Sequence, residues 1–321
     1  TEISAFILKK LVKDANDLGD NPEPIKDVVI TCPAYFGTKE RMQTKQAGEI
    51  AGLNVLSIIN EPTAAAISYG VKTDQKKTVL VYDLGGGTFD VTLINVNGGA
   101  IKVIATGGDH HLGGVDWDTA LAEYMLAAFN EQNNTSYSFE DRLDLKYELL
   151  LLAEDKKKVL TAKQTAKATY QYEGNSARIE ISRELFNSLT ERKLDETIDA
   201  TKKVIAIAKE KLLVGGSSRM PQIKERVDKE FNCDAKLTDP DECVAKGAAI
   251  YAMNAAYSQA VRDYEEGESD DKPAPLRGDR TTVVNVTSKT YGTDVIIEGQ
   301  SMVQNLIFAN SSLPTKRIET F

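Results

Sequence analysis

One short segment constrains the fold of this chain more than any other feature. Val81–Asp90 reads VYDLGGGTFD, which is an apolar strand, three glycines and the start of a second strand. Consecutive glycines let backbone N–H groups approach an anion closely, because no Cβ atom is in the way. Asp83 and Asp90 flank the turn, and carboxylates of this kind hold Mg²⁺ through its waters. The segment therefore predicts a turn that binds phosphate and a hydrated metal ion.

A tight β-hairpin with solvated acids is the simpler interpretation of the same residues. Asp83 argues against it, because this residue ends an otherwise apolar strand, where an unpaired charge is costly. Two common nucleotide motifs are excluded: no GxxxxGK[ST] P-loop occurs, and no GxGxxG opens a helix.

A second glycine cluster follows the apolar residues Leu212–Val214. The segment Val214–Pro221 reads VGGSSRMP, and its serines and proline mark the start of a helix. A helix N-terminus offers free N–H groups and a positive dipole end to an anion or a nucleotide. Many αβ units begin in this way, so the cluster alone leaves both nucleotide binding and plain packing open.

A third cluster, Gly107–Gly114, is either a functional loop or two turns. It contains His110 and His111, and the chain has only 2 histidines. This scarcity favours solvated loop histidines over metal ligands. Without a GxSxG segment, it also leaves Ser–His–Asp catalysis unsupported.

Alternating helical and strand patterns predict an α/β fold. Helices are expected near 2–16, 38–51, after Asn60, at 117–129, 138–161, after Ser182 and at 241–261. Ser138 and Asp141 fit a capping arrangement for the helix at 138–161, and Ser182 is expected to cap the helix that follows it. Strands are expected at 28–31, 54–58, 78–83, 89–93, 101–106, 169–172, 177–181 and 212–214, and those at 78–83, 89–93 and 101–106 are expected to form an antiparallel meander. Residues 264–280 have the composition of a linker, and short strands follow at 281–286, 294–298 and 306–309.

Composition narrows the function classes. The net charge of −9 disfavours a sequence-independent nucleic-acid binder, which needs an excess of basic groups. Three cysteines far apart, Cys32, Cys233 and Cys243, cannot build a disulfide framework, which favours a reducing compartment. No apolar run approaches the ~18 residues of a membrane span.

Two segments are rich in small residues. Pro62–Tyr69 contains three consecutive alanines, and Val244–Ala252 contains Gly247 among alanines. Small side chains permit close helix crossing, because the distance between helix axes follows side-chain size. Both a hinge between two lobes and ordinary tight packing use such a crossing.

Taken together, these segments resemble the ATPase of the seventy-kilodalton heat-shock chaperones, the DnaK-type family. The resemblance rests on several motifs in the family's order: Cys32–Phe36 (CPAYF), Ile58–Gly70 (IINEPTAAAISYG), Asp83–Asp90, Gly108–Asp118 (GDHHLGGVDWD), Val214–Pro221 and Asp239–Ala249 (DPDECVAKGAA). It implies an actin-like, ribonuclease-H-like fold with two lobes around a nucleotide cleft. The implied domains are a nucleotide-binding domain at 1–262, with lobes at 1–72 and 73–240 and a connecting helix at 241–262. A linker at 263–282 and the start of a β-sandwich peptide-binding domain at 283–321 would follow.

The resemblance also implies residue roles toward ATP or ADP and Mg²⁺. The catalytic residues would be Glu61, Asp83, Thr88 and Asp90, with Asp83 and Asp90 organising the metal through water. The phosphates would lie on Gly85, Gly86 and Gly87. The adenosine pocket would be formed by Glu154, Lys157, Lys158, Thr161, Gly215, Gly216, Ser217, Arg219 and Asp241. Pro33 and Arg41 would relay nucleotide state to the peptide domain.

The departures from the family pattern concern the chemistry directly. The family has a first phosphate loop of Asp-Leu-Gly-Thr-Thr type and a catalytic lysine, and the 321 residues contain neither of them. Of the β domain, they contain only the start. Because phosphoryl transfer needs those cationic and amide groups, we expect these residues alone to bind nucleotide weakly and to show no significant ATPase activity. The family's leucine-rich linker reads TTVVNV at Thr281–Val286, and Lys158 replaces an arginine found in some relatives.

The function that the resemblance implies is that of a cytoplasmic, ATP-dependent chaperone for extended apolar peptides. J-domain co-chaperones and a nucleotide-exchange factor would be its partners, and neither nucleic acid nor membrane would be. Two alternatives stay open: another actin-like ATPase or sugar kinase, and a nucleotide-sensing interaction module without ATPase activity.

Overall fold

A mixed six-stranded sheet forms the centre of the computed structural model, which describes residues 1–19, 23–70, 77–97, 100–205, 210–214, 216–275, 282–284, 287, 290–297, 300–308, 311 and 316. The strands lie in the order β10–β5–β4–β3–β8–β9. Their bounds are β3 Lys77–Leu84, β4 Phe89–Asn97, β5 Ala100–Asp109, β8 Glu210–Val214, β9 Lys236–Leu237 and β10 Thr282–Val284. The predicted meander is confirmed, because β3, β4 and β5 pair antiparallel.

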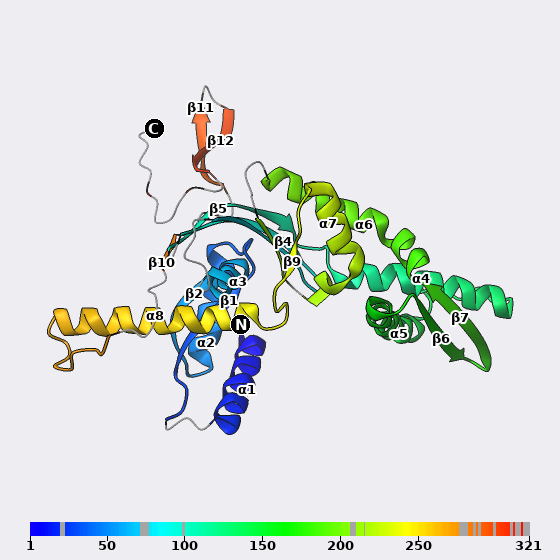
Figure 1. Ribbon diagram of the computed structural model, residues 1–321, viewed down its shortest axis with the longest axis horizontal. Helices are drawn as coiled ribbons and strands as arrows, with labels where there is room; N and C mark the ends of the chain where they lie inside the picture. The colour runs from blue at the N-terminus through cyan, green and yellow to red at the C-terminus, as the bar shows by residue number, and fades with distance from the viewer. Residues whose placement is uncertain are drawn as a thin grey trace.

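The central strands β3 and β4 are buried on both faces, and successive residues of a strand face opposite sides. On β3, Leu80 and Tyr82 belong to one apolar cluster, whereas Val79 and Val81 belong to another. The first cluster contains side chains of α4 (Gly114–Asn133), α6 (Arg183–Val204) and α7 (Pro221–Phe231), and the second contains side chains of α3 (Glu61–Gly70) and α8 (Cys243–Glu265). Figure 1 shows α3 and α8 on one side of the sheet and α6 and α7 on the other.

The two helices rich in small residues cross each other. A Cβ atom added to Gly247 of α8 would lie 1.7 Å from the backbone oxygen of Ala64 of α3. No side chain fits into that gap, so glycine is what allows α8 to contact α3. The close crossing predicted from the sequence is confirmed, and it fixes the position of Glu61, the first residue of α3.

Residues 1–19 and 23–60 form a smaller layer beside α3 and α8. The strands β1 (Asp27–Cys32) and β2 (Asn54–Asn60) pair parallel, and the helices are α1 (Glu2–Leu18) and α2 (Thr38–Ile50). Helix α1 buries only Ala5 among its described residues, while Ile3 and Phe6 are 79% and 72% exposed. This layer brings the loop between β1 and α2 to the start of the central strand β4, where Ala34 contacts Asp90.

A third group of elements packs beside α4. It comprises α5 (Leu143–Ala162) and the antiparallel pair β6 (Thr165–Tyr172) and β7 (Asn175–Ser182). The predicted start of α5 at Ser138 is wrong. Ser138 does bond to Asp141, at 2.7 Å between the side-chain oxygens, but this contact closes a turn and the helix begins at Leu143. Ser182 does cap α6, accepting a hydrogen bond from the N–H of Leu185 at 3.0 Å.

The C-terminal part contains a strand and a hairpin. Strand β10 pairs parallel with β5, so residues 282–284, which straddle the predicted boundary between linker and β domain, extend the central sheet. The hairpin consists of β11 (Tyr291–Ile297) and β12 (Gln300–Ile307), so the strand predicted at 306–309 is in fact longer and begins earlier. Helix α8 runs to Glu265, and 266–275 contain no helix or strand. The β-sandwich stays a prediction. Among the described helices, none is both long and apolar enough to cross a membrane.

Candidate nucleotide site

The acids predicted to organise a metal ion lie on one face of the sheet. Asp83 and Asp90 are direct register partners in the β3–β4 pair, so their side chains point to the same side. That side faces α3, because Val81, two residues before Asp83, packs in the cluster that contains α3. Glu61 begins α3 and its charge acts on both aspartates. The fold therefore gathers three carboxylates from three elements.

Burial sets the protonation of these acids. Desolvation and the charge of Glu61 raise the pKa of Asp83 to about 7. Desolvation, then the charges of Asp83 and Glu61, raise the pKa of Asp90 to about 7 as well. Desolvation also raises the pKa of Glu61. Among the described residues, no lysine or arginine forms a salt bridge with any of the three. Such a site gains from an added cation.

The described residues contain no group of three or more His, Cys, Asp or Glu side chains placed to hold a metal ion together. A hydrated Mg²⁺ fits this arrangement better, because Mg²⁺ keeps several waters and uses few protein ligands. The carboxylates of Asp83 and Asp90, which form no salt bridge with the described lysines and arginines, fit such an ion.

The loop between β1 and α2 contacts Asp90 from the smaller layer. The backbone N–H of Ala34 donates to Asp90 and partly offsets the rise in its pKa. Arg41 of α2 donates through Nε to the carbonyl of Phe36 at 2.9 Å, and its Nη2 contacts Asn60, the neighbour of Glu61. Pro33 lies in the same loop and its carbonyl accepts from the N–H of Phe36 at 3.2 Å. Pro33 and Arg41 thus lie beside the acids and outside the pocket described below.

An aromatic contact connects the same loop to the third glycine cluster. The rings of Tyr35 and His110 lie 3.6 Å apart between centroids, at 33°. His110 was expected to be a solvated loop histidine. The residue is exposed, and its ring also lies against the ring of Tyr35.

The glycine turn rests on the third glycine cluster. The N–H of Gly85 donates to the carbonyl of Thr88 at 2.9 Å and closes the turn. The N–H groups of Gly114 and Val115 donate to the carbonyls of Gly85 and Gly86 at 2.9 and 2.8 Å. A Cβ atom on Gly113 would lie 2.4 Å from the backbone nitrogen of Gly87. Gly113–Val115 therefore act as a bed that holds the turn in place.

A pocket of about 520 Å³ opens beside the turn. Its lining residues come from the turn, α4, α5, the short helix η1 (Gly216–Arg219) and the segment before α8. They are Gly86, Gly114, Val115, Asp118, Glu154, Lys157, Lys158, Thr161, Ser217, Arg219, Met220 and Asp241. These segments are far apart in the sequence. The fold brings them together around the glycine turn.

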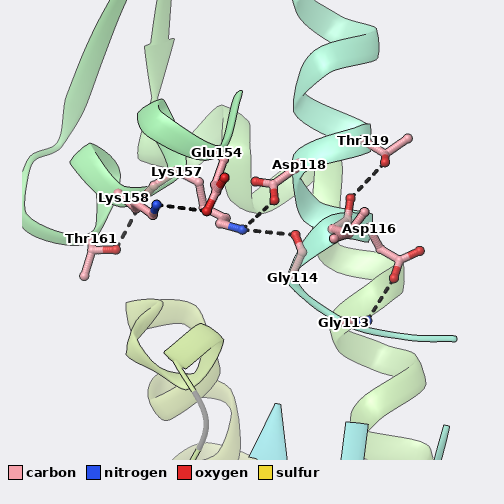
Figure 2. Close-up of polar contacts among 10 residues, drawn as sticks. Gly113, Gly114, Asp116, Asp118, Thr119, Glu154, Lys157, Lys158 and Thr161 are labelled. Carbon is pink, nitrogen blue, oxygen red and sulfur yellow. Dashed lines mark hydrogen bonds and ion pairs between the residues drawn. The ribbon is translucent and has the colours of Figure 1, made fainter. Parts of the chain in front are cut away.

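Ion pairs line the walls of this pocket. Lys158 pairs with Glu154 at 2.8 Å along α5, and Arg219 pairs with Asp241 across the opening. Thr161 Oγ1 donates to the carbonyl of Lys157 at 3.4 Å. Lys157 reaches across to α4, as Figure 2 shows.

Most predicted pocket residues meet in this one place. Of the residues assigned to the adenosine pocket, Glu154, Lys157, Lys158, Thr161, Ser217, Arg219 and Asp241 line it. Gly216 begins η1, beside Ser217, and Gly215 lies outside the described residues. Gly85, Gly87 and Thr88 lie in the turn at the edge of the pocket, next to Asp83 and Asp90.

Four residues that line the pocket were not predicted from the sequence: Gly114, Val115, Asp118 and Met220. The first three belong to the segment GDHHLGGVDWD, whose glycines were interpreted either as a functional loop or as two turns. No residue type in that segment signals which acid is buried, and burial is what distinguishes Asp118 from Asp116.

The sheet, the glycine turn and the charged pocket define an α/β protein with a candidate nucleotide site. The chain matches the family model described as "Hsp70 protein" over residues 1–264. The chain therefore belongs to the Hsp70 family, whose ATPase has the actin-like fold.

Curated relatives agree with this assignment. The chaperone protein DnaK of Thermosipho melanesiensis is 39% identical over 336 aligned positions, which cover all of this chain and 52% of the relative. The chaperone protein DnaK of Thermosipho africanus is 38% identical over the same length, and that of Thermotoga neapolitana is 39% identical over 337 positions, or 53% of the relative. The chain thus spans about half the length of the curated relatives it matches.

Proposed function

We propose that the full-length protein is an ATP-dependent chaperone that binds Mg-ATP or Mg-ADP between the glycine turn and the pocket. One observation carries the proposal: a turn of three glycines has unpaired buried acids on one side and a charged pocket of nucleotide size on the other. The Hsp70 family membership and the name chaperone protein DnaK of the relatives support it.

The pocket side suits the nucleoside and the first phosphates. Lys157, Lys158 and Arg219 supply cationic donors from two walls, and Glu154 and Asp241 supply acceptors for ribose hydroxyls. The turn side suits the terminal phosphates, because Gly86 and Gly87 have open space where a Cβ atom would stand. A nucleotide that spans both places its phosphates beside Asp83 and Asp90.

The acids then orient the water that attacks the terminal phosphate. Mg²⁺, when bound, supplies charge neutralisation for the phosphates. Asp83 and Asp90 would hold the waters of that ion, Thr88 closes the turn beside them, and Glu61 faces them from α3.

Coupling to a peptide domain is the second half of the proposal. Arg41 and Pro33 hold the loop that donates to Asp90, so a change at the metal site moves this loop first. Strand β10 lies on the edge of the same sheet and leads into the hairpin β11–β12. Extended apolar peptides, a J-domain co-chaperone and a nucleotide-exchange factor are the partners that this cycle calls for, in a cytoplasmic setting.

Nucleotide titration of the full-length protein tests the proposal. We expect ADP and ATP to bind with higher affinity in the presence of Mg²⁺, and we expect ATP to release a bound fluorescent peptide. Asp83→Ala should abolish the Mg²⁺ effect, while Glu123→Ala, an exposed acid on α4, should leave it intact. Nucleotide binding without hydrolysis would indicate the interaction module instead, and phosphorylation of a sugar would indicate a kinase.

A further inference from the structure

The pocket contains one ion pair that is buried. Lys157 Nζ of α5 lies 2.8 Å from Asp118 Oδ2 of α4, and the two side chains are only 12% and 9% exposed. The same ammonium donates to the carbonyl of Gly114 at 3.1 Å. Figure 2 shows both bonds running from α5 to the N-terminal turns of α4.

Burial makes this pair different from the other ion pairs of the pocket. Lys158 and Glu154 are 67% and 44% exposed, so water solvates each of them without the other. Asp118 Oδ1, in contrast, is buried and has no hydrogen-bond partner. The carboxylate therefore depends on Lys157 for its charge balance, and a buried pair of this kind is costly to break.

The second bond of Lys157 connects the pair to the glycine turn. Gly114 accepts from Lys157 through its carbonyl and donates to Gly85 through its N–H. A Cβ atom on Gly114 would lie 3.2 Å from Lys157 Nζ and 2.4 Å from Ser217 Oγ. The ammonium is thus fixed where the bed of the turn, η1 and α5 meet.

We propose that Asp118 is a positioning residue for nucleotide binding: it holds the Lys157 ammonium between the glycine turn and the α5 wall of the pocket. This inference rests on the proposed function. A lysine ammonium sits on a flexible four-carbon stem, and a phosphate attracts it strongly. Asp118 keeps the ammonium at the carbonyl of Gly114, so the donor is in place before the nucleotide enters. Removing the charge of Asp118 releases it.

A plain tether between α4 and α5 is the alternative role of the same pair, and the two roles separate in a double-mutant cycle. The variants are Asp118→Asn, Lys157→Met and both together, made in the full-length protein. Titration with a fluorescent ADP gives the affinity, and chemical unfolding without nucleotide gives the stability. Glu123→Gln, an exposed acid on α4, is the matched control.

We expect Asp118→Asn to weaken ADP binding about tenfold, since the negative charge that holds the Lys157 ammonium is removed. Glu123→Gln should leave the affinity unchanged. The double variant has no charge at either position of this pair, so it should regain stability relative to Lys157→Met. Its ADP affinity should nevertheless equal that of Lys157→Met, because Asp118 acts only through the lysine.

Other outcomes overturn the inference in distinct ways. If the double variant regains affinity together with stability, the pair is a tether. If Asp118→Asn binds ADP as the unmodified protein does, Asp118 has no role in binding and the proposed function stands. If the unmodified protein binds no nucleotide at all, the proposed function and this inference fall together.

Discussion

The acids of the candidate site fall into two groups with different surroundings. Asp118 is buried with a lysine 2.8 Å away. Glu61, Asp83 and Asp90 are gathered without a salt bridge among the described residues, and burial raises the pKa of each. Asp118 has its pKa raised by burial as well, but the hydrogen bond and charge of Lys157 act in the opposite direction.

The difference indicates what each group is for. A buried acid paired with a lysine has its charge balanced within the chain, so it suits a role in positioning that lysine. Acids that lie close together without a lysine or arginine partner are stabilised by a cation from outside, so they suit a metal site. The two groups lie on either side of the same glycine turn, and each can be disturbed by itself.

The largest expected effect comes from removing the cation of the paired group. Lys157→Met leaves Asp118 buried without a partner, and we expect a loss of about 3–5 kcal/mol in the free energy of unfolding. Denaturant titration measures it. Lys158→Met is the matched control, since its pair with Glu154 is exposed and contributes about 0.5 kcal/mol or less. Equal losses in the two variants would remove the distinction between buried and exposed pairs.

The bed that both groups share is the next target. Gly113→Ala would bring a Cβ atom to 2.4 Å from the backbone nitrogen of Gly87, and backbone cannot yield as a flexible side chain does. We expect a loss of about 1–3 kcal/mol, as for overpacking elsewhere. Gly86→Ala serves as control, because its Cβ atom would meet nothing within 4 Å. Thermal unfolding of both variants without nucleotide decides the matter, and a stable Gly113→Ala would contradict the described packing.

The unpaired group predicts a pH dependence. The pKa values of Asp83 and Asp90 rise from 3.8 to about 7 on folding. Between these values the folded state keeps protons that the unfolded state has lost, so stability decreases as the pH rises through this window. We expect stability to fall continuously between about pH 4 and about pH 7, since each aspartate is more easily protonated in the folded state than in the unfolded state.

Unfolding curves across this pH range, with and without Mg²⁺, measure the effect. Mg²⁺ should recover stability at the upper end of the range and not at the lower end, where the acids are protonated. Asp83→Asn should flatten the pH dependence. Stability that increases with pH in the absence of metal would refute the described protonation of the group.

The smallest expected effect concerns the acid of α3. The charge of Glu61 raises the pKa of both aspartates, so Glu61→Gln should lower both pKa values. We expect the pH midpoint of the stability change to fall by less than about 1 unit, since the charges interact across a partly solvated gap. Carbon-detected NMR titration of the aspartate carboxyl groups measures it. Unchanged midpoints would show that burial alone raises the pKa values.

Much of the fold followed from local patterns. The meander β3–β5, the Ser182 cap and the crossing of α3 and α8 were all predicted, because each depends on residues near one another or on side-chain size. The start of α5 was predicted wrongly. Ser138 and Asp141 do bond, but this pattern closes a turn as readily as it caps a helix, and the sequence alone does not distinguish the two.

The sequence by itself determined where the glycine clusters and acids lie: three glycines between two strands, with Asp83 and Asp90 on either side, and a second glycine cluster before a helix. The tertiary structure decided which charges are paired. Asp116 and Asp118 are the same residue type and lie two positions apart, yet only Asp118 lines the pocket and pairs with Lys157. The physical reason is that burial and charge pairing depend on contacts between distant segments, here α4 with α5, and local sequence patterns carry no information about these contacts.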